Sequence, residues 1–340
     1  IDTWVISDTG STDGTQALIL DIMKDVPGEL VEREWRDFGH NRDEVLQMAS
    51  DKADYSLIID ADEWLECEKE FDFSNLTEDS YYIIKRQINK DYWVRNIVKN
   101  GIGWRWKDVI HEYLVCENAS GYGDIEGAII QVLQEGARAL DPMTYRKDAG
   151  ILTSALATDP DNTRYQFYLA QSWRDAKEDE LAITNYKKRL EMGGWEEEEF
   201  ISHYEIANAM KRMNQPWPET LAQYLKAWEH TPQRAEPLYQ IGSHYMEAQN
   251  WASALLFLKQ ASEIEKPVDL MLFLQDAIYD YMSLIDAAVS AGNLGNYDEM
   301  RKLHKTLFKR KNVPEDMIQL AKNNQNYFEG LETKKKDKAA

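Results

Sequence analysis

The feature of this sequence that most constrains its fold is a change of residue pattern near residue 140. Before that point, short β-type apolar runs alternate with stretches whose apolar residues recur at helical spacing; after it, the pattern is almost wholly helical. Alternating strands and helices are typical of a sheet covered by helices, whereas an all-helical stretch must pack helix against helix. We therefore predict an α/β domain over residues 1–140, a helical domain over 144–325 and a disordered tail over 326–340.

The α/β domain is predicted from five consecutive segments that read as strand, helix, strand, helix and strand. These segments are Trp4–Ser7, Thr15–Met23, Leu30–Trp35, Asn41–Ala49 and Ser56–Ile59. Such an order predicts a mostly parallel sheet. Ligands of parallel sheets bind at the carboxyl ends of the strands, so residues that follow the strands are the candidates for a site.

The helical domain contains a weak internal repeat. Small residues recur in three similar segments at Ala170, Ala207 and Gly242, which are 37 and 35 residues apart. This spacing is close to the tetratricopeptide period of about 34 residues, in which small residues let the two helices of a pair pack closely. A second small residue follows in each unit, at Ala182, Ala222 and Ala254. The repeats are irregular, so a generic helical domain stays the alternative.

Composition excludes some partners. The formal net charge of −21 argues against nucleic acid, because a polyanion would be repelled over most of the surface. With only two cysteines no disulfide framework is expected, so a reducing, cytoplasmic setting is the default. No apolar run approaches the roughly 18 to 20 residues that span a bilayer.

The first motif with chemical content is the segment from Asp8 to Thr15, directly after the first predicted strand. Its glycines permit a tight turn, and Ser11 and Asp13 are good caps for the next helix. A capped turn alone would leave Asp8 unexplained, because its carboxylate sits at the strand end, where it can accept hydrogen bonds from a base or ribose. Nucleotide binding is therefore our interpretation, with a capped turn as the alternative.

The second motif is Asp60-Ala61-Asp62-Glu63, which ends an apolar run. In a turn that leaves a strand, Asp60 and Asp62 can reach one divalent ion, and oxygen ligands suit Mg²⁺ or Mn²⁺ held together with substrate phosphates. Three acidic residues within four positions would repel one another without a cation. An Asp-rich surface turn is the alternative.

Together these motifs resemble family 2 of the glycosyltransferases, with its nucleotide-binding GT-A fold, and more narrowly the subgroup in which that domain is fused to tetratricopeptide repeats. The similarity extends to further segments along nearly the whole chain. They are Trp35–Arg42, Tyr168–Ser172, Arg189–Leu190 with Gly193–Trp195, and Arg234–Leu238. Family members usually begin with one more strand and helix than this chain, so we expect the first strand of the domain to be missing here.

The resemblance implies roles for the residues of both motifs. Asp8 would contact the nucleotide, with Ser11 and Asp13 beside it. Asp60 would face the ribose or the metal, and Asp62 would bind the metal directly. Arg42 would lie near the diphosphate, where its fixed charge is useful; pairing with Asp37 or Asp43 is the alternative.

The segment from Gly103 to Glu112 resembles the acceptor side of the family, which ends in His-Glu. An acceptor hydroxyl needs a base close by, and Glu112 is the first choice for it and Asp108 the second. His111 would bind the metal or position the acceptor. Trp104 and Trp106 would line the acceptor site, unless they are core residues. Arg138 is a further candidate for the donor diphosphate, with a surface position as its alternative.

The function that the resemblance implies is transfer of a sugar, with inversion, from a nucleoside diphosphate sugar, expected to be a UDP-sugar, to a hydroxyl of a saccharide, lipid-linked or protein acceptor. Mn²⁺ or Mg²⁺ would be the cofactor, and the repeats would bind an acceptor or a protein partner. One alternative is a non-catalytic repeat scaffold with a relic transferase domain. A sugar nucleotidyltransferase is the other, but the Gly-rich loop with a basic residue that it needs is not seen in the sequence.

Overall fold

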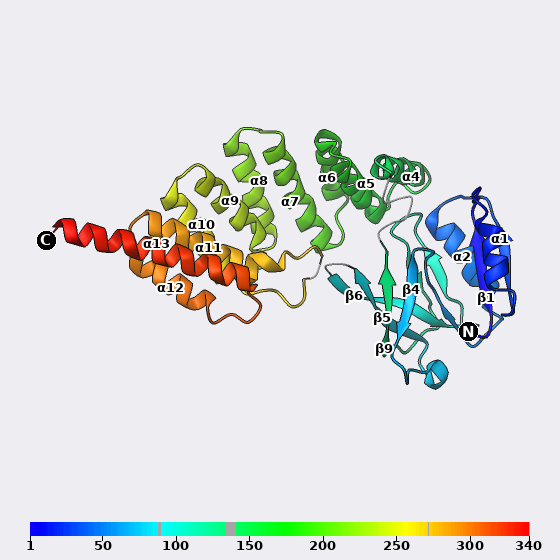
Figure 1. Cartoon of the computed structure of the whole chain (residues 1–340). Coiled ribbons are helices and arrows are strands. Elements are labelled where there is room, and N and C mark those ends of the chain that lie inside the picture. The colour runs from blue at the N-terminus through cyan, green and yellow to red at the C-terminus, as the bar shows by residue number, and fades with distance from the viewer. Residues whose placement is uncertain (88–89, 134–140, 271, 340) are drawn as a thin grey trace. The chain divides into compact units, whose positions relative to one another are not determined.

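A computed structural model describes residues 1–87, 90–133, 141–270 and 272–339 of the chain. The chain divides into two compact units, Ile1–Pro160 and Asp161–Ala340, each described below by itself (Figure 1). The division falls later than the expected boundary near residues 140–144, because the helix α4 (Thr144–Thr158) groups with the first unit. None of the helices within the described ranges is long and apolar enough to span a membrane.

Unit 1 begins with the strand–helix–strand–helix order predicted from the sequence. The elements are β1 (Trp4–Asp8), α1 (Thr15–Ile22), β2 (Gly28–Glu32) and α2 (Phe38–Ala49). β1 and β2 pair in parallel, with Trp4 opposite Gly28. The ring of Trp4 covers Gly28 so closely that a Cβ there would lie 2.4 Å from it, which explains the missing side chain.

The rest of unit 1 is built on a five-stranded mixed sheet in the order β3-β6-β5-β9-β4. Its strands are β3 (Tyr55–Leu57), β4 (Glu63–Cys67), β5 (Ser80–Gln87), β6 (Lys90–Lys99) and β9 (Gly123–Val132). Only β5 and β9 run parallel in it. The expectation of a mostly parallel sheet is therefore wrong, because β5 and β6 follow each other so closely that they pair antiparallel. The turn η1 (Phe73–Asn75) lies between β4 and β5.

The sheet buries one apolar cluster, and α2 covers another. Ile83, Ile97 and Ile130 are at most 1% exposed at the centre of the first cluster. In the second, Leu46 of α2 packs with Trp104, close to the small antiparallel pair β7 (Arg105–Lys107) and β8 (Tyr113–Val115). This packing brings the loop between β7 and β8 to the N-terminal end of α2.

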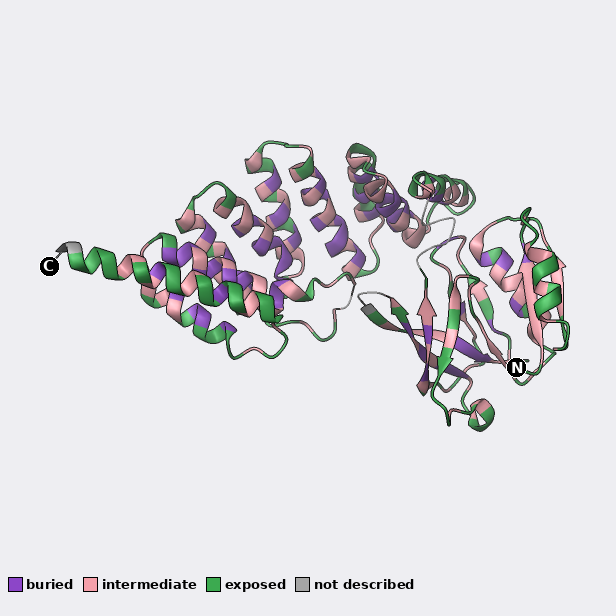
Figure 2. Ribbon diagram, in the orientation of Figure 1, coloured by how far each residue is buried: buried purple, intermediate pink, exposed green. Residues whose placement is uncertain are grey.

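Unit 2 is a tetratricopeptide-like array, so the prediction of an all-helical second half is confirmed. Its helices are α5 (Thr163–Asp175), α6 (Asp179–Met192), α7 (Glu196–Arg212), α8 (Trp217–His230), α9 (Glu236–Glu247), α10 (Trp251–Glu263), η2 (Ile278–Met282), α11 (Ser283–Asn293), α12 (Tyr297–Leu307) and α13 (Glu315–Ala339). Each helix from α5 to α13 packs against the next. Buried residues gather where helices face each other (Figure 2). The expected disordered tail is instead the second half of α13.

The small residues of the predicted repeat lie in these helix contacts. Ala170 and Ala207 are fully buried, and a Cβ on Gly242 would lie 2.5 Å from Leu258 of the paired helix α10. One of the predicted positions is wrong: Ala222 is exposed, and the small buried side chains of α8 are Thr220 and Ala227. Thr220 is the fourth residue of α8, as Ala182 is of α6 and Ala254 is of α10, so the repeat position is held there by a threonine and not by an alanine.

The repeat is more regular in the backbone than in the side chains. The first helices of the four pairs, α5, α7, α9 and α11, all end in the same turn, with one left-handed residue directly after the helix cap. In each turn the next residue donates its N–H five residues back, which is the Schellman arrangement. The left-handed residues are Lys177, Asn214, Gln249 and Gly295.

Candidate functional site

Arg42 joins the acidic motif Asp60–Glu63 to the segment that ends at Glu112. From α2, its Nη2 lies 2.6 Å from Oδ1 of Asp60, and its Nε lies 2.8 Å from Oε1 of Glu112. Asp60 follows β3, and Glu112 ends the loop between β7 and β8, so three distant segments meet at one guanidinium. The pairing with Asp37 or Asp43 that the sequence left open is not found, since Asp43 binds Arg105.

The charge of Arg42 is secured by its neighbours. Burial works to lower the pKa of the guanidinium, but the hydrogen bond and charge of Asp60, with further help from Glu112 and Glu63, outweigh it and raise the pKa above its ordinary value. The guanidinium also lies over the ring of Trp106, with 5.4 Å between its central carbon and the ring centroid. The cluster therefore holds a permanent cation between two carboxylates.

A second ion pair fixes the acidic turn, and sequence reasoning missed half of it. One carboxylate oxygen of Glu63 lies 2.6 Å from Nζ of Lys85, and the other accepts the backbone N–H of Asp60 at 3.1 Å. Both side chains are buried, with 4% of Glu63 and 11% of Lys85 exposed. Lys85 lies in β5 where the apolar run gives way to Arg86 and Gln87, so the sequence reads there as the ordinary polar end of a strand.

The loop that carries Glu112 has a strained backbone. Asp108 and His111 have φ angles of 75° and 55°, values that residues other than glycine adopt rarely. The loop is held against the start of α2, where the N–H of Phe38 donates to the carbonyl of Val109 at 3.2 Å. Gly39 allows this approach, because a Cβ there would lie 2.0 Å from the carbonyl oxygen of Asp108. Strain of this kind gathers at functional sites.

The two candidate acceptor tryptophans have different surroundings. Trp104 is 5% exposed and packs in the core beneath α2, as the alternative for it expected, so the structure offers no open face of its ring to a sugar. Trp106 is partly exposed and covers Arg42. Of the remaining candidates on this loop, His111 is exposed and Asp108 is half-buried. Trp106 is thus the aromatic ring that fits a platform at this cluster.

Asp8 organises the turn after β1. It is 6% exposed, and its Oδ1 accepts the backbone N–H groups of Gly10 and Ser11, both at 2.9 Å, and the side chain of Gln16 at 3.1 Å. The side-chain hydrogen bond from Ser11 is the largest of the causes that lower the pKa of this carboxyl. Asp13 accepts from Thr15, whose hydroxyl lowers its pKa as well. These contacts hold the turn itself, whereas the N-cap of α1 is Gly14 and has no side-chain cap hydrogen bond, so Ser11 and Asp13 are not the helix caps that the sequence predicts.

The candidate metal ligands differ in their contacts. Asp60 is engaged by Arg42, and Nζ of Lys85 lies 4.0 Å from its other oxygen. The carboxylate of Asp62 makes no hydrogen bond or ion pair with any residue that the structure describes, and its backbone carbonyl accepts from Leu133 at 2.9 Å. Over the same residues, no group of three or more His, Cys, Asp or Glu is placed to hold a metal. The predicted diphosphate ligand Arg138 lies outside the described residues.

Comparison with known proteins gives no family assignment. No protein-family model matches the sequence, and no curated protein matches it either. The cluster around Arg42 must therefore be interpreted from its own chemistry.

Solved structures show a likeness over about half of the chain. YrrB, described as a TPR protein with an unusual peptide-binding site, is 18% identical, with a TM-score of 0.39 over 54% of this chain and 85% of that one. MamA from Desulfovibrio magneticus RS-1 is 10% identical, with a TM-score of 0.38 over 51% and 88%. The quorum sensor NprR from B. thuringiensis is 17% identical, with a TM-score of 0.40 over 52% and 53%. Likeness at this level carries no conclusion about binding or activity.

Proposed function

We propose that unit 1 is a glycosyltransferase domain that binds a nucleoside diphosphate sugar at the Arg42 cluster. One observation carries the proposal: Arg42, Asp60, Glu112 and Trp106, chosen from separate stretches of the sequence, lie in contact around one guanidinium. A purely structural ion pair would not require the strained loop that brings Glu112 there.

The donor set suits a divalent cation that binds together with the donor. Asp60 and Asp62 supply carboxylate oxygens, and Mg²⁺ is commonly held by one or two carboxylates plus substrate phosphates. Asp62 is available, since its carboxylate has no partner within the described parts of the chain. A bound Mn²⁺ or Mg²⁺ would supply charge neutralisation for the leaving diphosphate.

The residues of the chain have separable tasks in this proposal. Arg42, freed from Asp60 when the donor binds, neutralises phosphate charge by a planar, charge-assisted contact. Glu112 accepts the proton of the acceptor hydroxyl, which then attacks the anomeric carbon opposite the departing diphosphate. Trp106 offers a ring face to a sugar. Lys85 and Glu63 hold the turn that presents Asp60, so the domain acts mainly by positioning and charge stabilisation.

Calorimetric titration of the full chain with UDP, in MnCl₂ and in EDTA, tests the proposal. We expect Mn²⁺ to tighten UDP binding and Asp62→Ala to remove that gain, whereas Asp51→Ala, at an exposed carboxylate outside the cluster, leaves it intact. The same affinity in Mn²⁺ and in EDTA contradicts the metal role. No binding of any nucleoside diphosphate contradicts the transferase itself.

The second candidate is a repeat scaffold whose first unit has lost catalysis. The observation in its favour is the helical unit, whose core runs from Phe167 in α5 to Phe328 in α13 and needs no contribution from the Arg42 cluster. A further point is that Arg42 already neutralises Asp60 without a metal. A chain that binds no nucleotide but binds a protein partner through unit 2 would support this candidate.

A further inference from the structure

A segment after α10 crosses to two earlier helices of the array. Residues 272–275 precede η2, yet they contact α7 and α9 rather than only their neighbours in sequence. The segment's base is closed by Lys266, whose Nζ lies 2.8 Å from Oδ1 of Asp276. Phe273 within it has a φ of 50°, an uncommon conformation for a non-glycine residue.

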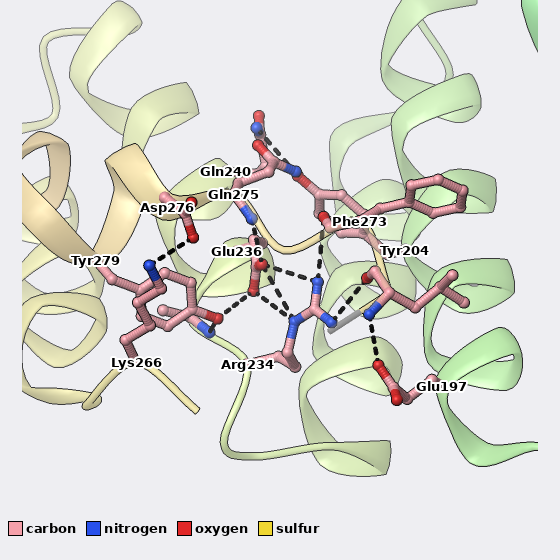
Figure 3. Close-up of polar contacts among 12 residues, drawn as sticks. Glu197, Tyr204, Arg234, Glu236, Gln240, Lys266, Phe273, Gln275, Asp276 and Tyr279 are labelled. Carbon is pink, nitrogen blue, oxygen red and sulfur yellow. Dashed lines mark hydrogen bonds and ion pairs between the residues drawn. The ribbon is translucent and has the colours of Figure 1, made fainter. Parts of the chain in front are cut away.

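The helices bind this segment through its main chain. Glu197 of α7 accepts the N–H of Leu272 at 2.7 Å, and Glu236 of α9 accepts the N–H of Gln275 at 3.2 Å. Arg234 donates to the carbonyl oxygens of Leu272 at 3.1 Å and Phe273 at 3.5 Å (Figure 3). Two donors and two acceptors of this turn-containing stretch are thus matched by three charged side chains.

Arg234 and Glu236, which bind the main chain of the segment, are buried in the core of the array. Arg234 is 1% exposed and Glu236 is fully buried, and they form a bidentate ion pair with distances of 2.9 to 3.1 Å. Arg234 also stacks over the ring of Phe200 at 4.4 Å. The hydroxyl of Tyr279 donates to Glu236 at 2.6 Å. A buried pair keeps its geometry only when its remaining hydrogen bonds are satisfied, and here the segment supplies several of them.

One side-chain contact adds selectivity. The amide of Gln275 donates to the hydroxyl of Tyr204 at 3.1 Å, beside a second contact from Gln240 at 3.3 Å (Figure 3). Arg234 and Glu197, in contrast, contact only main-chain groups of Leu272 and Phe273 in this stretch. The site therefore recognises a turn with a left-handed second residue, and a glutamine three residues after the first donor.

We infer that Glu197, Arg234, Glu236 and Tyr204 form a peptide-binding site that the chain fills with its own residues 272–275. The bound segment ties the N-terminal ends of α7 and α9 together and closes the site to other peptides. The site accepts a peptide in trans only when this segment leaves it.

Hydrogen exchange of the unmodified full chain is the first test. The amides of Leu272 and Gln275 should exchange as slowly as interior amides of α7 and α9, because the carboxylates of partly buried Glu197 and fully buried Glu236 accept them. The amide of Val268, whose residue is 85% exposed, serves as the internal control and should exchange fast. If Leu272 and Gln275 exchange at the rate of Val268, the segment is not bound and the inference is overturned. This measurement needs no variant and so cannot fail through misfolding.

A peptide in trans is the second test. The double variant Leu272→Pro/Gln275→Pro removes both donated N–H groups and should release the segment. A labelled synthetic peptide of residues 264–277 should then bind the folded variant saturably, as measured by fluorescence anisotropy, and should not bind the wild-type chain. Adding Glu197→Gln keeps an acceptor but removes its charge, so this charge-assisted hydrogen bond becomes a neutral one and binding should weaken roughly tenfold. Equal binding to the wild-type chain, no binding to the folded double variant, or no effect of Glu197→Gln would each refute the site.

Discussion

The buried pair between Glu63 and Lys85 allows the acidic turn to be tested separately from the stability of the sheet. Their charges lie 2.6 Å apart with little exposure to solvent, so replacing one partner leaves the other charge buried and unpaired. Such losses cost about 3–5 kcal/mol. We therefore expect Lys85→Met to lower the free energy of opening of the sheet by about that amount.

Replacing both partners should have a different effect. A buried ion pair exchanged for apolar residues of similar volume is often neutral in stability, so Lys85→Met/Glu63→Met should recover most of the loss. It cannot recover the hydrogen bond from the N–H of Asp60 to Glu63. The double variant should thus be stable but should bind UDP in the presence of Mn²⁺ more weakly than the wild-type chain, because Asp60 is no longer held.

Native-state hydrogen exchange of the full chain measures the free energy of opening of the sheet, because the amides of β5 and β9 exchange when it opens. The helices of unit 2 serve as the unaffected reference. A single variant that costs less than about 1 kcal/mol would show that the pair is not buried as described. A double variant as unstable as the single one would show that shape, and not an unpaired charge, causes the loss. If the double variant binds UDP normally, Glu63 does not position Asp60.

Three further predictions concern single positions. Glu112→Gln should reduce turnover of the sugar transfer roughly 10²- to 10⁴-fold, with little change in UDP affinity measured by calorimetry. If Glu112→Gln keeps near-normal turnover and Asp108→Asn loses it, the base is Asp108 and not Glu112. Burial raises the pKa of Asp286 to about 6, so between about pH 4 and pH 6 the folded state keeps a proton that the unfolded state loses. The free energy of unfolding should therefore fall by about 3 kcal/mol as the pH rises from about 4 to above 6. Urea unfolding should show this slope in the wild type and a shallower one in Asp286→Asn. Gly242→Ala should lose about 1–3 kcal/mol to overpacking relative to Gly330→Ala, a helix position with open space around it, and equal melting temperatures would refute the packing role.

Much of the architecture was predictable because its signals are local. The first four elements follow apolar periodicity and turn residues, and β1, for example, ends within one residue of the prediction. The helical half follows from the absence of β-type runs and from small residues such as Ala170, whose burial is set by the contact between paired helices. The sheet direction was not predictable in this way, because the pairing of β5 with β6 depends on a connection that propensity does not encode.

The site was predictable in its members but not in its contacts. Arg42, Asp60 and Glu112 stand out as residue types in the sequence, yet only the fold shows that one guanidinium joins them. Lys85 could not be predicted because it stands next to Arg86 and Gln87, where the sequence reads as the ordinary polar end of a strand. Arg234 stands out in the sequence only as part of the segment Arg234–Leu238. Its contact with Leu272 joins residues too far apart in sequence for a local pattern to predict it. The role of Arg138, which lies outside the described residues, stays a prediction.

The left-handed residues that end α5, α7, α9 and α11 have a consequence for how such an array changes over time. Only one of the four is glycine, so three of the turns hold a conformation that costs an ordinary residue about 1 kcal/mol, offset by the hydrogen bonds that close them. Backbone hydrogen bonds thus set the bend between paired helices, and the turn tolerates many side chains. The sequences of the repeat units can therefore diverge until the repeat period is hard to detect, while the geometry of the units is kept. The same three turns are places where glycine, which adopts this conformation without strain, should add stability.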